Sequence, residues 1–129
     1  ELYMSNQEEA ITQIIEKVSG ISREVIRGKS RVKRIGIPRS ILGYMLREEV
    51  GCTYKRAGEL VGRDHASIIK YNRDHKDNFK FYSDYKVLYR EVQSRYISDF
   101  KGVKFSLLQK QIDDVQNQLN KIVESNKEY

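Results

Sequence analysis

The stretch YKRAGELVGRDHASIIKY, residues 54–71, decides the fold, because it reads as two helical segments joined through a single glycine. The first segment, residues 54–61, ends where Gly62 permits a tight turn, and the second begins near Asp64, a residue type that caps helices. Two helices joined in this way form a helix-turn-helix unit, whose second helix enters the DNA major groove. We therefore expect the side chains at the start of the second helix to contact bases.

Hydrogen-bonding groups are concentrated at that helix start. Asp64 can accept from a cytosine amino group, His65 can donate to or accept from a base, and Ser67 can reach a phosphate. Free backbone N–H groups at the same end favour a phosphate as well. The alternative is that Asp64 only caps the helix and His65 is an ordinary surface residue.

The remainder of the chain also predicts helices, so the expected fold class is all-α. An amphipathic first helix carries an apolar stripe and ends at Gly20; the stripe consists of Ile11, Ile14, Ile15 and Val18. Ser22 is expected to cap a short second helix, and Pro38 to open a third helix that reaches about Val50. Apolar and polar residues alternate nowhere for long enough to predict a sheet.

Positive charge is segregated in one part of the chain. The formal net charge is +6, and the segment from Arg27 to Arg47 contains seven basic residues and no carboxylate. It includes the connector KSRVKRIGI, residues 29–37. Arginine suits phosphate and groove contacts, so the connector favours a nucleic-acid partner. A solvated basic face is the alternative.

Several other functions are not expected. The single cysteine, Cys52, cannot form an internal disulfide, and no apolar run approaches the roughly 18 residues of a membrane span, so a cytoplasmic protein without a membrane partner is expected. GKS at residues 28–30 ends like a P-loop, but Arg23 stands where the first glycine is required, which argues against nucleotide binding. Cys52, His65 and His75 match no zinc spacing. We expect no metal, no cofactor and no enzymatic activity.

Three motifs also carry a resemblance to a known family. GRDH at residues 62–65, PRSILGYMLREE at residues 38–49 and the basic connector together resemble the C-terminal DNA-binding domain of DnaA, the bacterial chromosomal replication initiator. The resemblance spans roughly residues 8–95. It implies a helix-turn-helix fold that binds double-stranded DNA at a specific site.

The resemblance assigns roles to particular residues. It implies that Arg39 reaches into a minor groove, that Arg47 contacts a phosphate, and that Arg63 with Asp64 and His65 forms the base-reading signature. Thr53, Tyr54 and Lys55 replace the family's serine, leucine and proline, and Ala66 with Ser67 replaces a threonine pair while keeping a methyl for thymine. The expected DNA-binding residues are Arg31, Lys33, Arg34, Arg39, Arg47, Thr53, Tyr54, Lys55, Arg63, Asp64, His65, Ala66, Ser67 and Lys70.

The C-terminal part has a different pattern. Two domains are expected, a DnaA-like helix-turn-helix domain at residues 5–101 and an association helix at residues 102–129. The second carries a heptad stripe of about three repeats: Phe105, Leu108, Ile112, Val115, Leu119 and Ile122. Homodimerisation through this helix is one alternative, and packing against its own domain is the other. Aromatic residues between Phe79 and Tyr96 can pack in the core, with Tyr85 and Tyr89 closing it, or stack on bases.

Taken together, the sequence predicts a sequence-specific double-stranded DNA-binding protein. The resemblance points to replication initiation or its regulation, without ATPase activity in this chain. The alternatives are the DNA-binding part of a transposase or recombinase, and a transcriptional regulator with the same fold.

Overall fold

The computed structural model describes residues 3–127 of the chain, and within that range the side chains of residues 100–107 and 127 are not described. Phe105, which was expected to begin the heptad stripe, is one of these. The described backbone contains helices and connecting turns but no β-strand, which confirms the all-α fold class. The chain divides into two compact units, Glu1–Tyr96 and Ile97–Tyr129.

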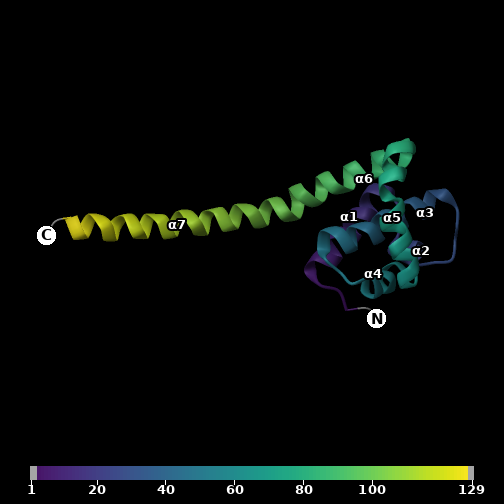
Figure 1. Ribbon diagram of the computed structural model, residues 1–129, viewed down its shortest axis with the longest axis horizontal. Coiled ribbons are helices and arrows are strands. Elements are labelled where there is room, and N and C mark those ends of the chain that lie inside the picture. Colours follow the sequence, from purple (N-terminus) through teal and green to yellow (C-terminus); the bar gives the residue numbers. More distant parts are fainter. Residues whose placement is uncertain (1–2, 128–129) are drawn as a thin grey trace. The chain divides into compact units, whose positions relative to one another are not determined.

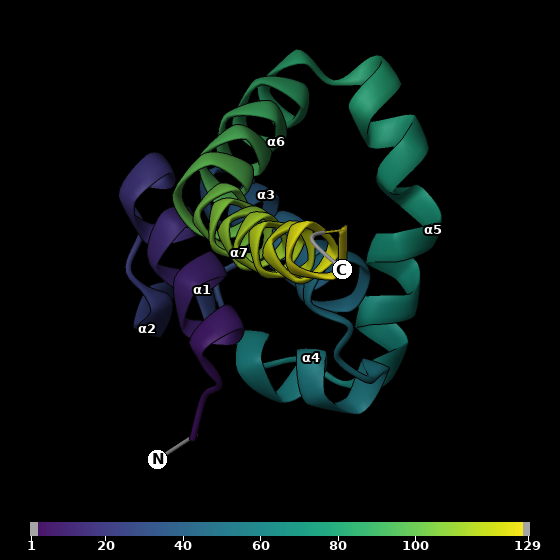
Figure 2. The same ribbon diagram turned by 90° about the vertical axis from the view of Figure 1, so that its left-hand side faces the viewer.

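The N-terminal unit is built from six α-helices and one π-helical segment among the residues described (Figure 1). In chain order they are α1 (Asn6–Ser19), α2 (Arg23–Ile26), α3 (Lys33–Met45), the π-helix η1 (Leu46–Val50), α4 (Tyr54–Val61), α5 (His65–Phe81) and α6 (Ser83–Tyr96). Within this unit α5 lies on the opposite side from α1 and α2 (Figure 2). The central α3 contacts α1, α5 and α6.

Local sequence signals account for most of the helix ends. Ser5 caps α1 through a capping box with Glu8, and Gly20 ends the helix with a left-handed φ of 73°. Ser22 caps α2 by accepting from the backbone N–H of Val25. These findings confirm the expected stop at Gly20 and the expected cap at Ser22.

The start of α3 differs from the prediction. It begins at Lys33, so Pro38 lies inside the helix rather than in its first turn, where it cannot donate the bond that would join it to the Arg34 carbonyl. Burial explains the earlier start, because helical spacing turns Ile35 inward on the same face as Pro38 and Leu42. Extending the helix through the connector therefore buries an isoleucine at the expense of one backbone hydrogen bond.

Aliphatic side chains from every long helix of the N-terminal unit form its core. Tyr85 and Tyr89 of α6 are buried, as expected for residues that close this core. The largest fully buried side chains are Ile11, Ile15, Ile26, Ile41, Leu42, Met45, Leu46, Leu60, Val61, Ile68, Val92 and Tyr96. Both α4 and α5 pack into this core, since α4 buries Leu60 and α5 buries Ile68.

A partly buried ion pair between Glu8 and Arg56 joins α1 to α4. The Glu8 carboxylate accepts from the Arg56 guanidinium at 3.0 Å and from the Cys52 thiol at 3.3 Å. The hydrogen bond from Arg56 is the main reason that the pKa of Glu8 is lowered to about 2. This pair fixes the first helix of the helix-turn-helix unit against the N-terminal helix.

The C-terminal unit contains the π-helix η2 (Ile97–Lys101) and the long helix α7 (Gly102–Lys127). The domain boundary that the sequence suggested, at Lys101, falls within this unit, at the end of η2. No helix in residues 3–127 is both long enough and apolar enough to cross a membrane.

Candidate nucleic-acid interface

The helix-turn-helix unit consists of α4, a turn at Gly62 and α5. Gly62 has a φ of 72°, and a Cβ at this position would lie 2.5 Å from the Arg27 carbonyl oxygen, so conformation and space both require glycine. Gly58 allows the same turn to pack against α4, because a Cβ at this position would lie 2.5 Å from the Arg63 carbonyl oxygen. The two glycines therefore allow α4 and the turn to pack closely ahead of α5.

Asp64 is the N-cap of α5. Its Oδ1 accepts from the backbone N–H and the hydroxyl of Ser67, both at 2.9 Å. The backbone bond is the main reason that the pKa of Asp64 lies below its usual value. The cap that the sequence suggested as an alternative is thus present, and it holds an exposed carboxylate in one orientation at the helix start.

The outward face of α5 begins directly after this cap. His65, Ala66 and Lys70, all expected at the interface, are exposed there. The same face continues with Ile69, which is 43% exposed, and with Arg73. Sequence reasoning missed these last two, although their spacing of four and eight residues from His65 places them on its side of a helix.

Arg39 lies in a different environment from the one expected. It is 3% exposed, and its guanidinium donates to the carbonyl oxygens of Ile26, Ser30 and Gly28 at 2.7, 2.8 and 3.1 Å. Burial is the main reason that the pKa of this arginine is lowered. A guanidinium in a minor groove must be exposed, so the role expected of Arg39 conflicts with this placement.

Two further arginines, Arg63 and Arg27, also donate to backbone carbonyl groups. Arg63 donates to the carbonyl oxygens of Gly28 and Gly62 at 2.9 and 2.8 Å, and Arg27 donates to the Leu60 carbonyl oxygen at 2.8 Å. We call Arg27, Arg39 and Arg63 the arginine clamp. Because the clamp joins the connector to the turn before α5, it positions the connector beside the start of that helix.

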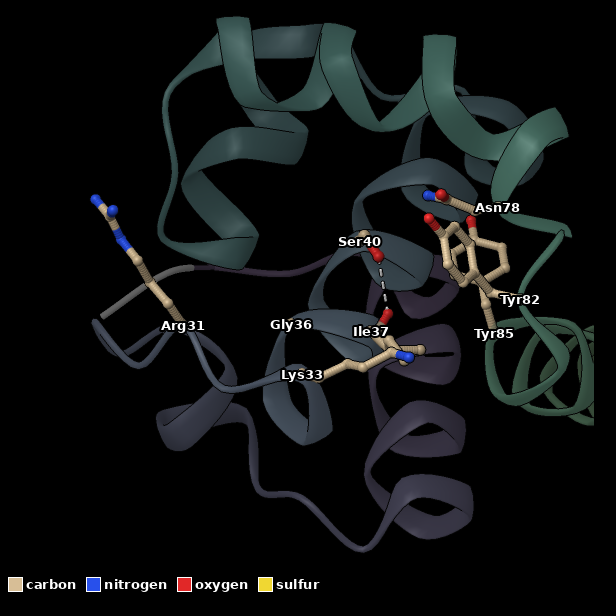
Figure 3. Close-up of a pocket in the computed structure, with 8 residues that line it drawn as sticks. All are labelled: Arg31, Lys33, Gly36, Ile37, Ser40, Asn78, Tyr82 and Tyr85. Carbon is tan, nitrogen blue, oxygen red and sulfur yellow. Dashed lines mark hydrogen bonds between the residues drawn. The ribbon is translucent and has the colours of Figure 1, made fainter.

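Two arginines of the connector, Arg31 and Arg34, are exposed. Arg31 lies in the extended segment before α3, and Figure 3 shows its guanidinium directed away from Asn78, Tyr82 and Tyr85. The basic connector thus divides its side chains between backbone-holding arginines and arginines that face solvent.

Lys33 faces the other side of α3. Its Nζ lies 3.1 Å from Asp84 Oδ2 and 5.4 Å from the centre of the Tyr82 ring. It borders a cavity of about 390 Å³, shown in Figure 3, which is lined by Arg31, Lys33, Gly36, Ile37, Ser40, Asn78, Tyr82 and Tyr85. The structure therefore brings Lys33 to α6 rather than to the start of α5.

The remaining predicted residues surround the start of α4. Thr53 caps this helix by accepting from the backbone N–H of Arg56, and Lys55 is exposed. Arg47 donates to the Cys52 carbonyl oxygen at 2.9 Å, and its guanidinium carbon lies 4.3 Å from the centre of the Tyr54 ring. Arg47 and Tyr54 consequently support the loop that precedes α4.

Most of the aromatic residues near α6 serve packing. Tyr44 stacks on His75 with 3.6 Å between ring centres, and the Tyr85 hydroxyl lies 2.6 Å from His75 Nδ1. Tyr89 packs edge-on against the same imidazole. Among the described side chains, no group of three histidine, cysteine or acidic residues is placed to hold a metal ion.

Comparison with known proteins identifies the family. The sequence profile described as "Bacterial dnaA protein helix-turn-helix" matches residues 8–74, just over half of the chain. The protein named "Chromosomal replication initiator protein DnaA" from Herpetosiphon aurantiacus is 39% identical over 56 residues, which is 42% of this chain and 12% of that protein. Proteins of the same name from Chloroflexus aggregans and Kosmotoga olearia are 37% and 35% identical over 62 and 63 residues, or 47% and 49% of this chain.

The residues that the profile matches, 8–74, extend over most of the N-terminal unit. They include the connector and the helix-turn-helix unit, and they end within α5. The chain spans about an eighth of the length of these relatives, with 13% and 14% of the last two proteins covered. The chain belongs to the bacterial DnaA helix-turn-helix family.

Proposed function

We propose that this chain binds a specific sequence in double-stranded DNA and acts in replication initiation or its regulation. The observation that carries the proposal is the exposed first turn of α5, which the arginine clamp holds beside a basic connector. The names of the relatives support the process. The profile match covers a helix-turn-helix region, and we propose that the chain works without ATPase activity of its own.

Base recognition falls to the outward face of α5. His65 can donate to or accept from a base edge, and Ala66 and Ile69 can contact the methyl group of thymine. Asp64 can accept from a cytosine amino group while its Oδ1 keeps the Ser67 N–H. The cap restricts the carboxylate to one orientation. A fixed orientation favours discrimination between bases over sequence-independent DNA binding.

Phosphate and minor-groove contacts fall to the exposed connector. Lys29, Arg31 and Arg34 are exposed; Arg31 lies in the extended segment before α3, Lys29 precedes that segment and Arg34 follows it. Arg31 is the guanidinium best suited to enter a minor groove, because Arg39 is bonded to three carbonyl groups. Thr53 and Lys55 at the start of α4, with Ser67 and Lys70 on α5, complete the proposed phosphate contacts.

Selection of bound sequences from a random pool of DNA duplexes tests the proposal. With the selected duplex, His65→Ala should weaken binding by about 1–3 kcal/mol and should have much less effect on random duplex. Arg34→Ala should weaken both by similar amounts, because a phosphate contact does not depend on sequence. Competition binding at fixed salt measures both effects.

Two additional variants complete this experiment. Asp64→Asn retains a residue that caps helices but changes the groups shown to a base, so it separates base reading from helix capping. Gln13→Ala, an exposed and charge-neutral change on α1, which lies on the opposite side of the unit from α5, is the control and should leave binding unchanged. If His65→Ala and Arg34→Ala reduce specific and random binding in the same ratio, α5 does not read the sequence.

A further inference from the structure

Helix α7 carries an apolar stripe that the C-terminal unit does not cover. The stripe consists of Leu108, Ile112, Val115, Leu119 and Ile122, which are between 51% and 57% exposed. They follow one another at alternating steps of four and three residues, so they form one line along the helix. A continuous exposed apolar surface of this kind is typical of an interaction site.

We propose that a second copy of this chain covers the stripe, so that two α7 helices form a parallel coiled coil. The alternating spacing is that of the a and d positions of a heptad, with Ile112 and Leu119 at a and the other three residues at d. Residues at these positions insert between side chains of the facing helix. A partner helix with the same spacing is needed, and a second copy of α7 supplies it.

The residues that flank the stripe are suited to a like partner. In a coiled coil the e and g positions border the apolar seam, and charges there select or reject a partner. Between Leu108 and Asn126 these positions are uncharged: Gln109, Gln111, Gln116, Gln118, Val123 and Ser125. Two identical helices therefore meet without like charges across the seam, and the exposed glutamine amides can hydrogen-bond between helices.

The charged residues in this part of α7, between Leu108 and Asn126, lie away from that border. Lys110, Asp113, Asp114, Lys121 and Glu124 occupy b, c and f positions, which face solvent in a two-stranded coiled coil. Gln109 uses its amide within the helix and donates to Asp113 at 3.2 Å. Recognition of an oppositely charged partner would need charges beside the seam, so the pattern favours self-association.

Asn126 favours the parallel orientation. It lies at the next a position after Leu119, and a parallel pair in register places the two asparagines opposite one another, where their amides can bond. In an antiparallel pair that aligns Ile112 with Ile122 and Val115 with Leu119, Asn126 would face Leu108. A polar amide would then lie against an apolar side chain. The parallel pairing satisfies both groups.

The consequence for DNA rests on the proposed function. Two paired chains join two helix-turn-helix units, so binding at one site raises the effective concentration at a second. The pairing itself does not depend on DNA. Its failure can therefore be distinguished from a failure of DNA recognition by measurements on the protein alone.

Sedimentation equilibrium of the complete chain without DNA tests the pairing. The wild-type protein should show twice the mass of one chain, and the Ile112→Lys, Leu119→Lys double variant should show the mass of one chain, because two charges in the seam are costly to desolvate. The matched control is Asn117→Lys with Asn120→Lys, at f and b positions of the same helix, which should remain a dimer. A single-chain mass for the wild type, or an assembly larger than two, overturns the proposal.

Cysteine cross-linking tests the orientation without a disruptive substitution. Ile112→Cys should give a disulfide-linked dimer on mild oxidation, because equivalent a positions face each other only in a parallel pair in register. Asn117→Cys, on the solvent face, should give much less. The wild-type chain controls for Cys52, which is buried. Equal cross-linking at 112 and 117, or none at 112, overturns the parallel pairing.

Discussion

Helices α1 and α7 carry the same kind of apolar pattern but differ completely in what covers it. In α1, Ile11, Ile14 and Ile15 are 0%, 9% and 0% exposed. In α7, Ile112 and Val115 are 51% and 55% exposed at the same three-residue spacing. The comparison shows that periodicity predicts a helix and its apolar face, whereas the covering of that face depends on which other elements are available.

The composition of each unit explains the difference. Helix α1 contacts α3, α6 and η1, so three elements cover its stripe. The C-terminal unit contains only η2 and α7 among its described residues, and η2 is a five-residue segment. Within its own unit, α7 has no other long helix to pack against, so its apolar face is not covered there.

The largest expected effect tests this comparison directly. Ile15→Ala in α1 should lower the free energy of unfolding by roughly 2–5 kcal/mol, because it leaves a cavity in a packed core. Ile112→Ala in α7, measured in dilute protein where self-association is absent, should change it by less than about 0.5 kcal/mol. Chemical denaturation followed by circular dichroism measures both. A large loss for Ile112→Ala under dilution would show that the chain covers its own stripe.

An intermediate effect extends the comparison to charged residues. Arg39 is buried and Arg34 is exposed, although both belong to the same basic segment. Arg39→Lys should cost roughly 1–3 kcal/mol of stability, since an ammonium group cannot reach the three carbonyl groups that the guanidinium serves and leaves some unpaired. Arg34→Lys should be close to neutral in the same denaturation experiment. Equal losses would contradict the structural role of the arginine clamp.

The smallest effect concerns two histidines of α5. Burial among Tyr44, Phe79, Tyr85 and Tyr89 lowers the pKa of His75. The unfolded chain then binds a proton more readily than the folded chain, so stability is complete above the unfolded pKa of about 6.5 and falls as the pH decreases below it.

Denaturation at a series of pH values measures this dependence. His75→Phe keeps an aromatic ring against Tyr44 and should have a shallower loss of stability below pH of about 6.5 than the wild type. His65→Phe, on the exposed face of the same helix, is the matched control and should keep the wild-type slope. Identical slopes for wild type and His75→Phe would show that His75 does not carry the effect.

Local signals made much of the fold predictable. The bounds of α4, the glycine turn and the cap at Asp64 follow from residues whose conformational preferences act within a few positions. The start of α3 did not follow from such a signal, because the tendency of Pro38 to begin a helix was outweighed by the burial of Ile35. Propensity acts on one residue, whereas burial depends on residues far along the chain.

Some features of the candidate site likewise follow from local sequence, and others depend on the tertiary structure. The sequence alone determined that α5 begins with exposed polar residues beside a basic connector, because charge and helix caps are local properties. Only the tertiary structure decided that Arg39 and Arg63 both bond to the Gly28 carbonyl, directly ahead of the connector, while Arg31 faces solvent. The carbonyl groups of Ile26, Gly28 and Ser30 come within reach of Arg39 only when α2, α3 and the turn before α5 pack together. Two arginines of one basic run can therefore have opposite roles, since burial is a property of the fold.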